Sequence, residues 1–241
     1  MPIETIDLVI GFVVTFLAAV VQGTIGMGFA IVSVPLLSII DPRLAPVPQL
    51  LVSIPLTTVM AFRERQHIDF KGLSWILAGR IPGALLGLAL LKAASESTIS
   101  LLIAGSVLIA VGALASGIAL TRSRSVDFAT GAFAGTSALV SSIGGPPMAL
   151  LFQREKAATV RASLGALFTV GLLITLVTRM AAGEITGLDV KVAAVLLPGM
   201  GLGFWTSTRI SGRLNESKIR PAILILSALA AVALVVRTAI A

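Results

Sequence analysis

The chain has 241 residues, of which 56% are hydrophobic and only 12% charged, with a formal net charge of +7 and no cysteine. Soluble domains carry about 25% charged residues, so this composition excludes a water-soluble fold and predicts an all-α, polytopic membrane protein. The single histidine and the missing thiols exclude a multi-histidine or thiolate metal site. The basic balance indicates membrane topology rather than nucleic-acid binding.

The first half of the chain opens with an interrupted apolar segment. Its break, residues 22–28, reads QGTIGMG and is too rich in glycine for a continuous helix. Three uninterrupted apolar stretches follow at about 47–62, 72–91 and 99–120. Each comes close to the roughly 20 residues that a membrane-spanning helix needs. Residues 1–121 are therefore predicted to form one transmembrane repeat, with a broken helical hairpin and three spans.

The second half, residues 122–241, repeats this order. Its break at 141–147 reads SSIGGPP, and apolar stretches follow at about 161–179, 189–207 and 219–238. Residues 69–71 (DFK) also correspond to 189–191 (DVK), and the same offset of 120 residues pairs small residues: Gly79 with Gly199, Gly83 with Gly203, and Gly87 with Ser207. An internal repeat explains these matches, and a generic membrane pattern shared by both halves is the alternative. We expect the small residues to pack helices rather than bind a ligand.

Lysine and arginine counts decide between two topologies. If each interrupted segment dips into the membrane and returns, the loops at 63–71, 121–127, 153–161 and 208–220 share one side with 12 basic residues, against five on the other. If each segment crosses instead, the two sides carry eight and nine. The returning arrangement is therefore predicted, with arms of about 15 Å in the second hairpin. It gives three crossings per repeat, about eight membrane segments in all, and inverted repeats like those of many secondary transporters.

The two breaks are the predicted substrate site. Their glycines have no side chain to cover the backbone N–H groups, and Pro146 and Pro147 suit the first turn of a new helix. A helix N-terminus attracts anions through its free N–H groups and its dipole. Close packing of helices through small residues is the alternative. The predicted binding residues of the breaks are Gln22, Gly23, Thr24, Gly26, Gly28, Ser141, Ser142, Gly144, Gly145 and Pro146.

The positions of the charged residues indicate which class of substrate the protein can bind. All eleven acidic residues lie at loop or helix-end positions, which argues against a cation substrate. Arg80 is the one charge well inside a predicted span, so it joins the candidate site; its alternative role is to hold C-terminal carbonyls of a neighbouring helix. Arg161, after the second break, either faces the vestibule or marks the membrane boundary. No catalytic residue, metal site or cofactor is predicted, and so no enzyme activity.

The sequence resembles the sulfite exporter TauE/SafE family, also called the toluene-sulfonate uptake permease family. The likeness rests on residues 22–37 (QGTIGMGFAIVSVPLL) and 142–147 (SIGGPP) and covers nearly the whole chain. It implies transport of sulfite, a sulfonate or a related sulfur-containing anion, with binding at 22–28 and 141–147. The chain departs from the family's common pattern at Met27, where glycine is often found, and at Gln49, where a small hydroxyl residue is usual.

These features together predict a secondary transporter that moves a small anion across the cell (inner or plasma) membrane by alternating access. An anion channel and a membrane scaffold without transport activity are the alternatives. The predicted partners are the anionic substrate and the lipid bilayer, with no nucleic acid. The sequence leaves open a coupling ion (proton or sodium), a homo-oligomer and the direction of transport.

Overall fold

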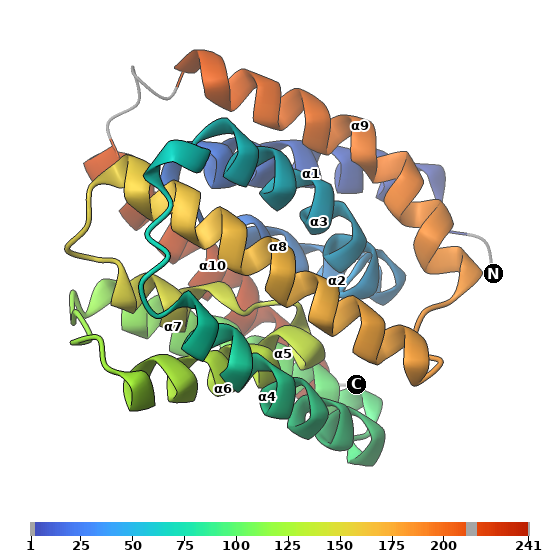
Figure 1. Cartoon of the computed structure of the whole chain (residues 1–241). Helices are drawn as coiled ribbons and strands as arrows, with labels where there is room; N and C mark the ends of the chain where they lie inside the picture. Colours follow the sequence, from blue (N-terminus) through green and yellow to red (C-terminus); the bar gives the residue numbers. More distant parts are fainter. Residues whose placement is uncertain (1–2, 211–215, 241) are drawn as a thin grey trace.

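Helices account for the whole of the described fold (Figure 1). The computed structural model describes residues 3–210 and 216–240, except for the side chains of 216–220, 222 and 223. This part of the chain contains no strand, which confirms the predicted all-α class. Its α-helices are α1 (Thr5–Ile25), α2 (Phe29–Ile40), α3 (Val47–Arg63), α4 (Leu73–Ala93), α5 (Glu96–Ala115), α6 (Arg124–Ser141), α7 (Gly145–Leu151), α8 (Ala157–Ala181), α9 (Gly187–Ile210) and α10 (Glu216–Ile240), and short 3-10 helices lie at Pro42–Leu44 and Arg65–His67.

The first interrupted segment is a helical hairpin, as predicted. Gly26 and Gly28 adopt φ values of 97° and 117°, which end α1 and start α2. The left-handed region is open to glycine without a steric penalty. The side chain of Leu37 in α2 lies 3.8 Å from the point where a Cβ on Gly11 of α1 would stand. Because Leu37 and Gly11 lie on opposite sides of the break, this contact means that α2 runs back along α1.

The second interrupted segment is also a hairpin. The Leu120 N–H, ahead of α6, donates to the Leu150 carbonyl of α7 at 3.0 Å, so α7 returns to the place where α6 began. The arms are unequal, however, rather than about 15 Å each. The 18 residues of α6 extend about 27 Å, and the seven of α7 about 10 Å. Residues 124–141 lack a proline or a glycine pair, so α6 continues until the 142–147 break stops it.

Six helical segments in the described residues are long and apolar enough to cross a membrane. Five of them match predicted spans: α3 with its preceding 3-10 helix, α4, α5, α8 and α9. The sixth is α1, the long arm of the first hairpin. The remaining predicted span falls on α10, where Leu224–Ile240 is apolar and the side chains of 216–220, 222 and 223 lie outside the described residues.

The stripe of small residues packs helices, as predicted. A Cβ added to Gly83 of α4 would overlap the Ala132 carbonyl of α6, and one added to Gly203 of α9 would overlap the Phe16 carbonyl of α1. Gly79 and Gly87 meet α6 one turn to either side of Gly83. Close backbone approach of this kind is a usual means of helix association in membranes. The two stripes thus join α4 to α6 and α9 to α1.

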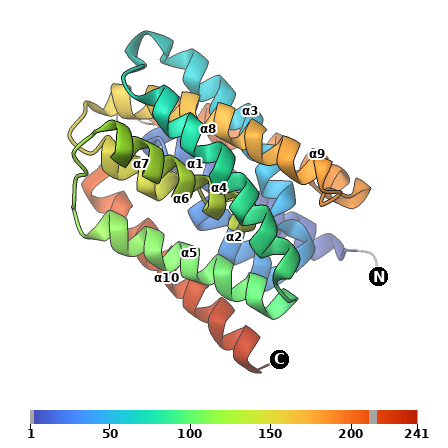
Figure 2. The same ribbon diagram turned by 60° about the horizontal axis from the view of Figure 1, so that its bottom comes forward.

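Helices of the first half of the chain pack against helices of the second half. Besides α4 on α6 and α9 on α1, α3 packs on α8, and α5 lies beside α10 (Figure 2). Helix α2 contacts α10, and α7 contacts α5. Exchanging residues 1–121 with 122–241 maps each of these pairs onto itself or onto another pair, as a two-fold repeat would. The division at 121 and 122 and the inverted orientation of the halves remain predictions.

The ends of the helices form two opposite faces. The start of α1 and the end of α10 lie at one end, and segments 64–72, 116–123 and 152–156 lie at the other, which we call the basic end (Figure 1). Arg122 ties this end together through ion pairs to Asp69 at 3.1 Å and to Asp127 at 3.2 Å. Its guanidinium also lies 4.9 Å from the centre of the Phe152 ring. The three segments therefore share one side, as the returning topology predicts.

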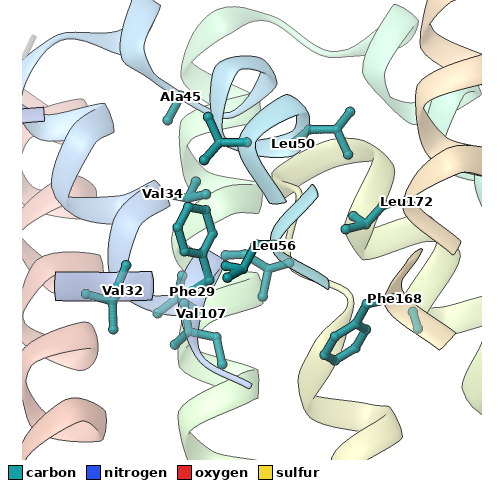
Figure 3. Close-up of a cluster of buried hydrophobic side chains, with 14 of the residues drawn as sticks. Phe29, Val32, Val34, Ala45, Leu50, Leu56, Val107, Phe168 and Leu172 are labelled. Carbon is teal, nitrogen blue, oxygen red and sulfur yellow. The ribbon is translucent and has the colours of Figure 1, made fainter. Parts of the chain in front are cut away.

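Apolar side chains from both halves meet in one core (Figure 3). Phe29 of α2, Leu56 of α3 and Phe168 of α8 belong to it. The outer surface is apolar as well: Ile6, Val9, Val13 and Leu17 line the exposed side of α1, and comparable side chains cover α4 and α9. An outer surface that is apolar fits a lipid environment. Helices fit it as well, because the backbone polar groups within a helix are satisfied internally.

Candidate anion-binding site

A central cavity of about 40 Å³ lies where the two hairpin breaks meet. Both breaks line it together with residues of α3, α4 and α8, so each half of the chain contributes to its wall. Six of the predicted site residues are among those that line it: Gln22, Gly28, Arg80, Ser142, Gly144 and Gly145. The breaks lie 119 residues apart in the sequence and meet at one cavity because both hairpins enter the bundle.

Among the described residues, Arg80 is the only charged one that lines this cavity. Its side chain is 1% exposed, and its one hydrogen bond in the described structure is a long one, from Nη1 to the Leu167 carbonyl at 3.5 Å. The buried Nε has no partner within the described residues. Glycines make room for the guanidinium, since a Cβ on Gly171 would overlap it and one on Gly144 would stand 2.9 Å from Nη2. Buried donors ordinarily have partners, so this unpaired group indicates a site for an acceptor.

Gln22 shapes the first break. Its Oε1 accepts a hydrogen bond from the Phe29 N–H at 3.0 Å and so caps the start of α2 from the end of α1. The first intrahelical bond of α2 is donated by the Val32 N–H to the Gly28 carbonyl. The first-turn N–H groups of Ala30 and Ile31 have no partner inside a helix, and both residues line the cavity. The α2 N-terminus therefore faces the cavity with free donors and the positive end of its dipole.

The second break is built differently. Pro146 and Pro147 occupy the first turn of α7, as predicted. They have no N–H to offer, so α7 presents fewer donors than α2. Ser142, with a φ of 58°, donates its Oγ to the Pro46 carbonyl at 3.0 Å and thereby fixes the break to the first half of the chain. The two helix starts meet as expected, but α2 supplies most of the backbone donors.

The other five predicted site residues lie in the breaks but do not line the cavity. The Thr24 and Ser141 hydroxyls donate to carbonyls one turn back, those of Val20 and Ser137. Gly23 packs on Ser207 of α9, and Gly26 packs on Arg161. Pro146 lines a different cavity, beside α5.

Two lining residues that the sequence did not single out are Ser53 and Thr57 of α3. Ser53 donates its Oγ to the Gln49 carbonyl at 2.6 Å, and the Thr57 hydroxyl is 3.2 Å from that of Thr169. Their signal in the sequence is a pair of hydroxyl residues one helical turn apart within a predicted span. Both add neutral hydrogen-bonding groups to the wall of the cavity that Arg80 also lines.

Acidic residues lie away from the cavity. In the described chain, the ion pairs join Asp41 to Arg43, Glu64 to Arg63 and Arg161, and Asp69 and Asp127 to Arg122, all near helix ends. No Asp or Glu is among the residues that line the cavity. The fixed charge of the cavity is therefore positive, which suits an anion.

Arg161 and Arg179 have structural roles. Arg161 pairs with Glu64 at 2.8 Å at the basic end, which fits the membrane-boundary interpretation. Arg179, at the end of the predicted span 161–179, is 3% exposed and donates its Nε to the Leu139 carbonyl at the end of α6 at 3.0 Å. The role considered for Arg80, holding C-terminal carbonyls of a neighbouring helix, thus belongs to Arg179.

A second cavity of about 230 Å³ lies at the basic end, and we call it the vestibule. Ile25, Phe152 and Val160 line it, and so does Met27. Met27 also lines the central cavity, so its side chain lies between the two spaces. The positive φ values of Gly26 and Gly28 on either side hold this residue out of both helices.

Comparison with known proteins agrees with the geometry. The sequence model of the family described as sulfite exporter TauE/SafE matches residues 11–234, which is nearly the whole chain and includes both breaks and Arg80. Searches of curated proteins and of solved structures give no match. Members of the matching family are transporters, and the resemblance in the sequence is confirmed. The chain therefore belongs to the sulfite exporter TauE/SafE family, and it is a multi-pass membrane protein.

Proposed function

We propose that this protein is a secondary transporter of a small sulfur oxyanion, with sulfite as the first candidate, in the plasma membrane. The observation that carries the proposal is Arg80, a buried cation whose Nε has no partner in the described structure and whose side chain lines the cavity between the two breaks. A guanidinium beside free backbone N–H groups is well suited to oxygen atoms that carry negative charge.

The size of the cavity favours a small anion. About 40 Å³ is room for roughly three water molecules. Sulfite, with one sulfur and three oxygens, is of this size, whereas an aromatic sulfonate adds a ring for which the cavity has no space. Phe29, Phe168 and Leu172 also line the cavity, and their large side chains limit the size of the anion that fits.

Burial favours a carrier over an open pore. Arg80, Gln22 and Ser142 are 1%, 3% and 4% exposed, so the polar side chains of the site are buried rather than arranged along an open channel. The walls of the cavity come from the hairpin of α1 and α2 with α3 and α4, and from the second break with α8. Rocking of one repeat against the other around a central site is the usual form of alternating access in inverted-repeat transporters.

Uptake of ³⁵S-labelled sulfite into proteoliposomes tests the proposal. We expect protein-dependent uptake that saturates with sulfite concentration, that unlabelled sulfite inhibits, and that toluenesulfonate does not. Uptake that rises linearly with concentration would indicate a channel instead. Absence of both uptake and binding, for sulfite and for other small sulfur anions, would favour the scaffold alternative.

A further inference from the structure

We propose that this protein exchanges anions one for one, so that an anion leaving on one side must be replaced by an anion from the other before the carrier can return. This inference rests on the proposed function and adds the mode of transport to it. Three features of Arg80 carry it: its charge is fixed in place, no acidic group of the described residues compensates it, and its side chain is buried.

The charge of Arg80 cannot leave the cavity by a rotation of the side chain. The guanidinium lies between Gly144 and Gly171, both so close that a Cβ on either would crowd it, and Nη1 reaches the Leu167 carbonyl of α8. Long cationic side chains near membrane interfaces extend toward water. Arg80 instead points into the bundle, 1% exposed, and remains with the binding site in every step of the cycle.

Nothing in the described structure neutralises this charge from within the protein. The residues that line the cavity include no Asp, Glu or His, and the ion pairs of the described chain lie near the helix ends. An arginine also keeps its proton under physiological conditions. A carboxylate that took up or released a proton could balance the cavity, but none lines it. The counter-charge must therefore come from the transported anion.

Alternating access requires an intermediate that is closed on both sides. With a monovalent anion bound, such as hydrogensulfite, the closed cavity is neutral: one positive charge on Arg80 and one negative charge on the substrate. Without an anion, closure buries a lone cation, which is strongly unfavourable. The loaded protein therefore crosses between its two states and the unloaded protein does not. One-for-one exchange of monovalent anions then moves no net charge.

Efflux from proteoliposomes tests this mode directly. Vesicles containing the full-length protein are loaded with ³⁵S-sulfite at mildly acidic pH, where hydrogensulfite predominates, and diluted into either sodium gluconate or unlabelled sulfite. Gluconate is too large for the cavity. We expect efflux at least about tenfold faster into sulfite than into gluconate. A potassium diffusion potential set with valinomycin should change the rate of exchange by less than about twofold, since no net charge crosses.

Equal efflux into gluconate and into sulfite would overturn the exchange mode while leaving sulfite transport intact. A strong dependence of exchange on membrane potential would overturn the one-for-one charge balance. Absence of protein-dependent efflux into either buffer would instead contradict the proposed function. Arg80→Gln provides a second test: any flux that it retains should lose the preference for external sulfite, because its unloaded cavity is neutral. The matched control is Arg124→Gln, which removes an exposed arginine that lies over Trp75 and should keep the preference.

Discussion

Arg80 gives the central cavity its charge, whereas Gln22 gives the first break its shape. The Gln22 Oε1 accepts from the Phe29 N–H, so the amide holds α2 against the end of α1 just beside the cavity. A carboxylate at the same position can accept this hydrogen bond equally well, but it brings a negative charge to the site. The two functions of the residue, in stability and in binding, can therefore be separated by substitution.

We expect Gln22→Glu to preserve the structure of the first break and to weaken anion binding. Thermal stability in detergent should stay near that of the wild type, while sulfite affinity falls at least about tenfold because two negative charges then share the cavity. Gln22→Ala should instead lower the free energy of unfolding by about 1–3 kcal/mol, since the buried Phe29 N–H loses its acceptor. Undiminished sulfite binding by Gln22→Glu, measured by calorimetry, would place the anion elsewhere.

Met27 separates the central cavity from the vestibule, and its substitution tests that arrangement. The chain has no cysteine, so Ser53→Cys introduces a single thiol into the wall of the central cavity. We expect a negatively charged thiol reagent to label this thiol several-fold faster when Met27 is also changed to Ala, and at an unchanged rate with the conservative Met27→Leu. Equal rates in all three backgrounds would show that the reagent enters by another route.

At the scale of the helix, backbone contact between the two halves determines the packing. Gly83 and Gly203 allow α4 to lie directly on α6 and α9 directly on α1. The α5 helix also carries glycines, but Gly105 has no atom near the position of an added Cβ. A methyl group should therefore be harmful at the first two positions and harmless at the third.

Gly83→Ala and Gly203→Ala are each expected to destabilise the protein by about 1–3 kcal/mol, because the added carbon overlaps a backbone carbonyl that cannot move away. Gly105→Ala should be neutral or stabilise the protein by about 0.5–1 kcal/mol, as alanine favours the helix. Thermal unfolding in detergent compares the three variants. Equal loss of stability at Gly105 would mean that glycine is needed on α5 for a reason other than this packing.

Features that depend on neighbouring residues in the sequence could be predicted, whereas features that depend on packing between distant segments could not. The breaks could be predicted because glycine and proline interrupt a helix wherever they cluster, and the stripes because small residues recur at every fourth position. The residues that line the cavity could be predicted only in part. Gly23 and Thr24 belong to the same break as Gln22, yet the packing of α9 on α1 turns them away from the cavity.

Long-range packing also explains why the sequence did not reveal the roles of Ser53 and Arg179. Ser53 lies in an uninterrupted span, where its one-turn spacing from Thr57 does not tell a hydroxyl that lines a cavity from one that only donates to a carbonyl one turn back. Arg179 stands near the end of its span and looks like a loop residue in the sequence. Its burial follows from the unexpectedly long α6, whose last carbonyls reach its guanidinium.

At the scale of the whole molecule, the returning hairpins place three loop segments and most of the basic residues on one side. The positive-inside rule assigns that side to the cytoplasm. Single cysteines can test this in cells, because the natural chain has none. Gln66→Cys stands at the basic end, and Ser97→Cys stands in the exposed first turn of α5 at the opposite end.

A membrane-impermeant maleimide added to intact cells should label Ser97→Cys and leave Gln66→Cys unlabelled until the membrane is permeabilised. Labelling of Gln66→Cys from outside would reverse the assigned orientation. Labelling of both residues from the same side would contradict the helix arrangement itself, since α4 separates the two positions.

Calorimetric titration of the purified protein with sulfite shows whether the cavity beside Arg80 binds the transported anion. Comparison of the wild type with Arg80→Lys, Arg80→Gln and the exposed control Arg124→Gln isolates the role of this guanidinium. We expect the sulfite affinity to fall about 10- to 100-fold in Arg80→Gln, which corresponds to the loss of hydrogen bonds to a charged group. We expect partial retention in Arg80→Lys and no change in Arg124→Gln. Equal sulfite affinity in the wild type and in a folded Arg80→Gln would contradict binding of the anion beside Arg80.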